Sequence, residues 1–121
     1  EHPMTLTALT NVARLQLSNE APSQALPLAE QAARMADRLY NGETNPRHAS
    51  TWATLADARF ANSDTDGAGI AMQRATTLLA TVKEPPPSIS KYLAEVRARV
   101  CAPSVSAGCL GRGSPATSGR D

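Results

Sequence analysis

The sequence predicts an all-α fold built from repeated helix pairs, and three observations support this class. Alanine, which favours helices over strands, occupies 22 of the 121 positions. Aromatic residues make up only 3% of the chain, so small side chains must form the core between closely packed helices. The chain also matches itself at an offset of 43 residues without a gap, and a polar stretch divides each matching unit. Each unit is therefore expected to be a pair of helices.

Ten pairs of residues define the 43-residue offset. They are Pro3 with Pro46, Leu9 with Trp52, Val12 with Leu55, Ala13 with Ala56, Leu17 with Phe60, Asn19 with Asn62, Ala25 with Ala68, Ala32 with Ala75, Met35 with Leu78 and Leu39 with Val82. We expect the first repeat at 1–43 and the second at 44–84. One helix pair cannot bury its apolar face alone, so the two antiparallel pairs are expected to stack into a short α-solenoid.

The first two helices are predicted by apolar residues at three- and four-residue steps, which place these side chains on one face. The stripes are Leu6, Leu9, Val12, Ala13, Gln16 and Leu17 in the first helix, and Ala25, Leu28, Ala29, Ala32, Met35, Ala36 and Leu39 in the second. Pro27 falls inside the second stripe, so that helix either bends or loses a hydrogen bond there, or begins later. Asn41 and Gly42 predict its end, with a left-handed cap.

The third and fourth helices are predicted by their first residues. Asn45 precedes Pro46, and a proline at the first helical position gives up no hydrogen bond, so Asn45 is the expected N-cap. Asp64 and Asp66 lie where the positive end of a helix dipole favours acidic side chains. The prolines at 85–87 end the fourth helix, because no helix continues through them.

A fifth, capping helix is expected within 85–100. It is predicted by a four- and three-residue spacing of apolar residues, Ile89, Leu93, Val96 and Val100. Residues 101–121 are rich in Ser, Gly and Pro and poor in large apolar side chains, so burial would not offset the entropy lost on ordering them. We expect a disordered tail there.

Charge and composition exclude some classes of partner. Twelve basic and 11 acidic residues give a net charge of +1, too weak a field to hold nucleic acid or an anionic membrane. Neither a membrane span nor a signal peptide is predicted. Cys101 and Cys109 are the only cysteines and are expected to be free thiols, which favours the cytoplasm. The excess of arginine over lysine is typical of GC-rich bacterial genomes.

The repeat resembles the long tetratricopeptide repeat of kinesin light chains and of many bacterial proteins, over residues 2 to about 83. The resemblance rests on His2-Pro3, Leu9, Asn11, Ala13, Leu15, Ala25-Leu26-Pro27-Leu28, Ala32, Gly42 and Asn45-Pro46. It implies that six alanines occupy contacts between helices, namely Ala13, Ala25, Ala32, Ala56, Ala68 and Ala75. It also implies that the first helix of each pair lines a concave surface, which binds extended peptides in this family.

Polar residues of the two first helices form the candidate peptide-binding site: Thr7, Asn11, Arg14, Ser50, Thr54 and Asp57. The amide of Asn11 can donate to and accept from a bound backbone, and the resemblance implies that role; the alternative is an asparagine that only faces solvent. Arg14 and Asp57 are repeat equivalents of opposite charge, which argues against a basic clamp for a terminal carboxylate. We expect a ligand that is neither strongly acidic nor strongly basic.

Catalysis, a cofactor and a bound metal are not expected. His2 and His48 have no Asp, Glu or Cys at metal-ligand spacing, and we expect both to be solvated near helix starts. The tail glycines Gly108, Gly111 and Gly113 follow no strand, so they predict no phosphate-binding loop. No serine, cysteine or histidine lies in a nucleophile motif.

The expected function is a scaffold that binds an extended peptide or a partner helix, and not an enzyme. One alternative is a regulatory or oligomerisation segment at the end of a larger bacterial signalling enzyme, such as a serine/threonine kinase. Another is a small stand-alone structural subunit. The exposed ends of the stack offer surfaces for self-association. Trp52, the only tryptophan, is expected to anchor the core.

Overall fold

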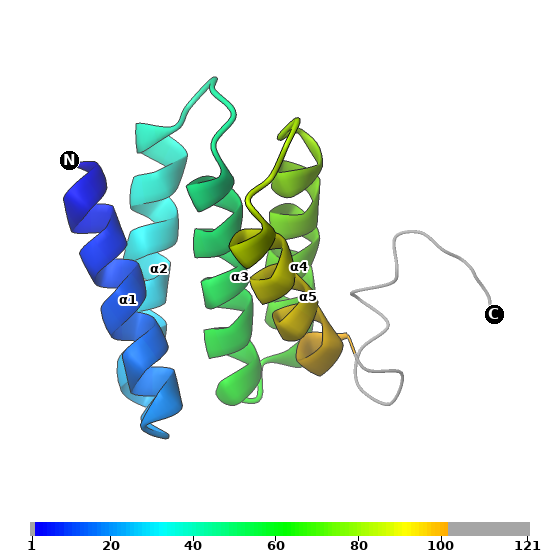
Figure 1. The fold of residues 1–121 in the computed structure, drawn as a ribbon. Helices are drawn as coiled ribbons and strands as arrows, with labels where there is room; N and C mark the ends of the chain where they lie inside the picture. The colour runs from blue at the N-terminus through cyan, green and yellow to red at the C-terminus, as the bar shows by residue number, and fades with distance from the viewer. Residues whose placement is uncertain (1, 102–121) are drawn as a thin grey trace, which may run out of the picture.

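The computed structural model describes residues 2–101, and these form five α-helices and no strand (Figure 1). The helices are α1 (Pro3–Ser18), α2 (Pro22–Leu39), α3 (Pro46–Ala61), α4 (Thr65–Ala80) and α5 (Pro87–Val100). The expected all-α class is confirmed for this part of the chain. The expectations for the tail after Cys101, including those for Cys109 and the glycines, fall outside the described residues.

Successive helices lie side by side and alternate in direction, from α1 on the left of Figure 1 to α4 and α5 on the right. The central helix is α3, which contacts each of the other four. The helices α1, α3 and α5 together form one face of the molecule, and side chains from all three meet there.

Side-chain caps begin three of the helices. The Nδ1 atom of His2 accepts the N–H of Met4 at 3.0 Å, and Asn45 Oδ1 accepts the N–H of Arg47 at 2.8 Å, as expected of Asn45. Asp64 Oδ1 accepts the N–H of Gly67 at 3.0 Å. Each bond satisfies a backbone donor that has no partner inside its helix.

The turns after α1 and after α3 have the same backbone geometry. Glu20 and Ser63, which lie 43 residues apart, are the only non-glycine residues with positive φ in the described part of the chain, at 59° and 67°. In each turn the next residue donates to a carbonyl five positions back, Ala21 to Gln16 at 2.8 Å and Asp64 to Arg59 at 2.9 Å. This is the Schellman arrangement, so the 43-residue offset of the sequence recurs in the backbone.

Glycine at either left-handed position should stabilise the protein. We expect Ser63→Gly to raise the free energy of unfolding by about 0.5–1 kcal/mol, because it removes the steric cost of positive φ while adding some chain entropy to the unfolded state. Urea denaturation followed by circular dichroism measures the change. Glu20→Gly is the matched variant, and a loss of stability in both would contradict this backbone geometry.

The core is made of alanine, as the composition predicts. All six alanines that the resemblance places at helix contacts are 0–1% exposed. Larger side chains fill the remaining space, and Leu6, Leu55, Met72, Val96 and Val100 are among those fully buried. Trp52 packs against this core but is only half-buried, so the expectation of a central tryptophan anchor needs correction.

Two details of α2 differ from, or resolve, the sequence expectation. The helix begins at Pro22 and continues through Pro27, so the later start is wrong, and the carbonyl of Ser23 lacks the N–H that a proline cannot provide. The helix ends at Leu39 with Tyr40 as its C-cap. Gly42 has the expected left-handed conformation, with φ of 79°, but lies in the loop beyond the cap.

Candidate functional site

The face shared by α1, α3 and α5 contains a pocket of about 430 Å³. We call it the upper pocket, because it lies toward the N-terminal ends of these three helices, and α1 and α3 begin at their upper ends in Figure 1. The side chains that give it polar or charged character include Thr7, Asn11, Arg14, Arg47, Ser50 and Tyr92. Thr7 and Ser50 are repeat equivalents, 43 residues apart. Two positions that are 43 residues apart in the sequence thus place small hydroxyls beside one pocket.

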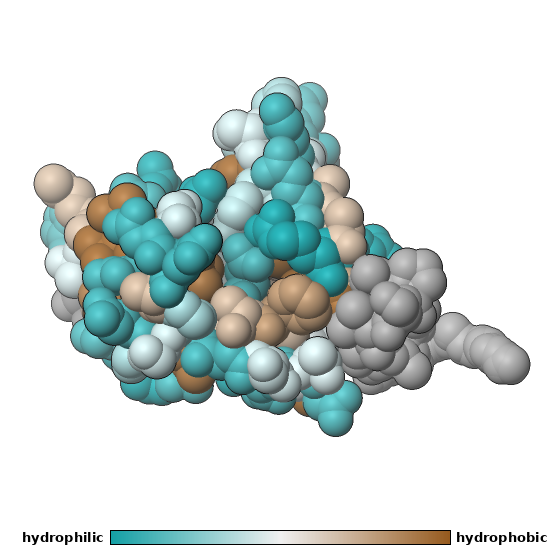
Figure 2. Space-filling view, turned by 90° about the horizontal axis from the view of Figure 1, so that it is seen from below, coloured by the Kyte–Doolittle hydropathy of each residue, from teal (hydrophilic) through white to brown (hydrophobic). Residues whose placement is uncertain are grey.

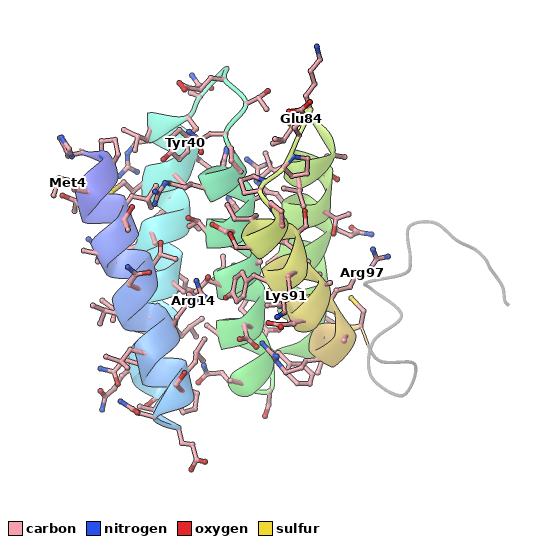
Figure 3. The ribbon with its side chains drawn as sticks, in the orientation of Figure 1. Met4, Arg14, Tyr40, Glu84, Lys91 and Arg97 are labelled. Atoms are coloured by element: carbon pink, nitrogen blue, oxygen red, sulfur yellow. The ribbon has the colours of Figure 1, made fainter. Side chains whose placement is uncertain are left out.

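The charged side chains of the upper pocket are both basic. Arg47 donates from Nη1 to the hydroxyl oxygen of Thr7 at 2.8 Å, which holds its guanidinium over the pocket. Arg14 lies with its guanidinium carbon 4.0 Å from the centre of the Tyr92 ring, a cation–π contact between α1 and α5. Figure 3 shows Arg14 between α1 and α3. The upper pocket therefore attracts negative charge.

A second pocket of about 520 Å³, the lower pocket, continues the same face toward the other ends of the helices. Its lining includes Arg14, Asp57, Phe60, Glu95 and Arg99. Arg99 of α5 binds both carboxylate oxygens of Asp57, from Nε at 3.2 Å and from Nη2 at 2.8 Å. These hydrogen bonds raise the pKa of Arg99. The positive charge of the guanidinium balances the negative charge of the Asp57 carboxylate.

Tyr92 of α5 borders both pockets. Its hydroxyl lies 2.9 Å from the Oγ1 of Thr54, and Thr54 donates its own proton to the carbonyl of Ser50 at 3.0 Å. The hydroxyl of Tyr92 is therefore the donor to Thr54. Burial raises the pKa of the Tyr92 phenol, so the side chain stays neutral and able to donate.

The six predicted site residues divide among these places. Thr7, Asn11, Arg14 and Ser50 line the upper pocket, and Asp57 lines the lower one. Thr54 is 1% exposed beneath Tyr92 and cannot meet a ligand while α5 is in place, which corrects its expected role. Leu17 and Phe60, which are repeat equivalents, both line the lower pocket and both pack against the core.

Three further residues matter here that sequence reasoning missed. Arg47, Tyr92 and Arg99 each place a functional group on the shared face. Arg47 could have been found, because its repeat equivalent is Met4, and a change from apolar to charged is a departure from the repeat. Tyr92 and Arg99 lie on α5. No pattern in the sequence indicates which residues of α1 and α3 this helix contacts.

A separate polar cluster joins α2, α3 and α4 through Asp37. One carboxylate oxygen, Oδ1, accepts from His48 Nε2 at 2.7 Å, from Trp52 Nε1 at 3.0 Å and from Arg74 Nη2 at 2.9 Å. Burial opposes ionisation of Asp37, but the hydrogen bonds from His48, Arg74 and Trp52 together hold its pKa below the ordinary value of 3.8. His48 is 6% exposed, so the expectation of a solvated histidine is wrong at this position.

Cys101, expected to be a free thiol, is disulfide-bonded. Within residues 2–101 no three His, Cys, Asp or Glu side chains gather as a metal site would require. None of the helices described is long and apolar enough to cross a lipid bilayer.

Comparison of the chain with protein-family models, with curated proteins and with solved structures finds no match.

Proposed function

We propose that this chain is a protein-interaction module in which helix pairs stack in the manner of tetratricopeptide repeats and the upper pocket binds an extended peptide. One observation supports this most strongly: four of the six side chains expected to contact a peptide line the same pocket. The two Schellman turns and the buried alanines support the stacking. Asn11 is exposed at the pocket, where its amide is available to a bound backbone.

The ligand we propose contains an acidic side chain or a terminal carboxylate. The expectation of a ligand of mixed charge depended on Asp57, which lines the lower pocket and is paired with Arg99. Arg14 and Arg47 remain as the charged groups of the upper pocket. A guanidinium can donate two parallel hydrogen bonds to one carboxylate, and Arg47 uses only one of its donors on Thr7.

Peptide binding should depend on the charge of both partners. In fluorescence anisotropy with peptides that differ only in a central Glu, Gln or Lys, we expect the Glu peptide to bind best. Arg47→Gln should weaken its binding by about 1.5–3 kcal/mol, the contribution of hydrogen bonds to a charged group. Asn11→Ala should weaken all three peptides, because the amide pairs with backbone and not with the variable side chain.

The matched control is Arg34→Gln, which removes the same charge from an exposed position on α2 outside both pockets. It should bind the Glu peptide like the wild type. If both Arg34→Gln and Arg47→Gln weakened binding of the Glu peptide equally, the effect would come from the net charge of the protein and not from the position of Arg47. Unchanged binding in Arg47→Gln would contradict the proposal, and thermal melts of each variant separate lost binding from lost folding.

A further inference from the structure

The outer face of α1 carries a stripe of apolar side chains that no helix among residues 2–101 covers. Met4, Val12 and Leu15 are 74%, 43% and 58% exposed, and Ala8 between them is exposed as well. Their spacing of four, four and three residues puts them on one side of the helix. The hydrophobic colour at the α1 end of Figure 2, on the left, and the outward position of Met4 in Figure 3 agree with this.

Three of the four stripe positions are buried one repeat later, whereas the equivalent of Met4 is the exposed Arg47. The equivalents of Ala8, Val12 and Leu15 are Thr51, Leu55 and Ala58 on α3, and these are 2%, 2% and 0% exposed. Their helix, α3, is packed against by all four of the other helices. The stripe on α1 is thus the surface of a helix-to-helix contact that lacks its covering helix. The single charged residue of α1, Arg14, faces Tyr92 and not this side.

The opposite end of the molecule has a groove that is lined mostly by apolar side chains. It lies between α4 and α5, has a volume of about 480 Å³, and has a floor that includes Met72, Leu79 and Leu93. Its exposed rim includes small side chains, among them Ala80 and Ala94. Its one charged residue is Arg97, which Figure 3 shows on the side of the molecule away from Met4.

We propose that the chain associates head to tail with a second copy of itself, with α1 of one copy in the α4–α5 groove of the next. The large side chains of the stripe, Met4, Val12 and Leu15, fit between the small rim residues over the leucines of the floor. The stripe has no charged side chain, so placing it in the groove causes no charge repulsion with Arg97. This association does not depend on peptide binding, because neither surface belongs to the upper pocket.

The helix that carries the stripe, α1, and the helices that form the groove, α4 and α5, lie at opposite sides of the molecule in Figure 1, so a pair of copies leaves one of each surface open. Such a contact is heterologous and does not close in a dimer. The assembly therefore grows with protein concentration. A contact between two α1 stripes would instead be self-complementary and would stop at two copies.

Sedimentation velocity of the full chain over a range of concentrations tests the proposal. We expect the weight-average mass to rise steadily above the 12.7 kDa monomer and to pass the mass of a dimer. Leu15→Glu should abolish the rise, because it places a charge in the stripe, and Ala94→Arg should do so by blocking the groove. Ile70→Glu is the matched control: Ile70 is 60% exposed on α4 but lies outside both surfaces, so this variant should associate like the wild type.

Mixing the two blocked variants decides the geometry. Leu15→Glu keeps an intact groove and Ala94→Arg keeps an intact stripe, so neither associates alone but the mixture should form a dimer and nothing larger. A wild type that stays monomeric overturns the proposal. So does an Ala94→Arg variant that still dimerises, which would indicate a stripe-to-stripe contact. Circular dichroism of each variant confirms that it is folded before the comparison is made.

Discussion

Leu55→Ala should lower the free energy of unfolding by about 2–5 kcal/mol, whereas Val12→Ala, at the equivalent position of the first repeat, should cost less than about 1 kcal/mol. Leu55 is 2% exposed and lies in the main core cluster, between α3 and the helices that pack on it. Removing its side chain leaves a cavity, because most of its buried neighbours are alanines, whose side chains are too short to fill the space. Val12 is 43% exposed, so its methyl groups are already partly in water.

The comparison is made by urea denaturation of both variants at a protein concentration low enough to keep the chain monomeric. The slope of free energy against urea should stay the same, because neither change alters how much surface unfolding exposes. Equal costs at the two positions would contradict the burial that the structure assigns to them. A larger cost for Val12→Ala at high protein concentration than at low concentration would instead measure the proposed association.

The contrast between Val12 and Leu55 also shows the limit of reading this sequence as a repeat. The spacing of apolar residues and the helix-start signals correctly predict the helices and their order, because those depend on local pattern. The six alanines that the resemblance places at helix contacts are buried. The 43-residue offset, however, equates Val12 with Leu55, although one is exposed and the other buried. Burial depends on what lies next to a helix in space, and among the described residues the helices that pack on α1, chiefly α2 and α3, leave Met4, Val12 and Leu15 exposed.

The candidate site was predictable to the extent that it lies on the repeats. Thr7 and Ser50 meet at the upper pocket because equivalent positions on α1 and α3 share a face. The fate of Thr54 and Asp57 depends on α5, which covers one with Tyr92 and pairs the other with Arg99. The spacing of apolar residues predicted α5 itself, but it contains no information on which polar residues that helix reaches.

The Asp37 cluster was not predicted, because it joins three helices through polar residues that fit no motif. Trp52 looked like a core anchor for its size, yet its indole N–H needs a partner, and Asp37 at the edge of the core provides one. The guanidinium carbon of Arg74 lies over the face of the indole ring, 4.9 Å from the ring centre. The tryptophan therefore joins the alanine core to the polar surface.

Asp37→Ala should lower the free energy of unfolding by about 1–3 kcal/mol, the cost of leaving the buried His48 nitrogen without a partner. His48 and Trp52 would lose their acceptor, while Arg74 is exposed enough to bind water instead. Arg74→Gln is the control, because it removes one donor from the same oxygen without orphaning a buried atom. It should cost less than about 1 kcal/mol. Urea denaturation at neutral pH measures both changes.

The same carboxylate should make stability depend on pH in the acid range. The pKa of Asp37 is lower in the folded protein than its ordinary value of 3.8, so the unfolded chain takes up this proton first as the pH falls. Stability from Asp37 is therefore complete above about pH 4 and is lost as the pH drops through the lowered folded pKa. Asp37→Asn removes the titrating group, so below pH 4 its free energy of unfolding should fall less steeply than that of the wild type. Parallel curves would show that the three hydrogen bonds to Asp37 do not favour its ionised form.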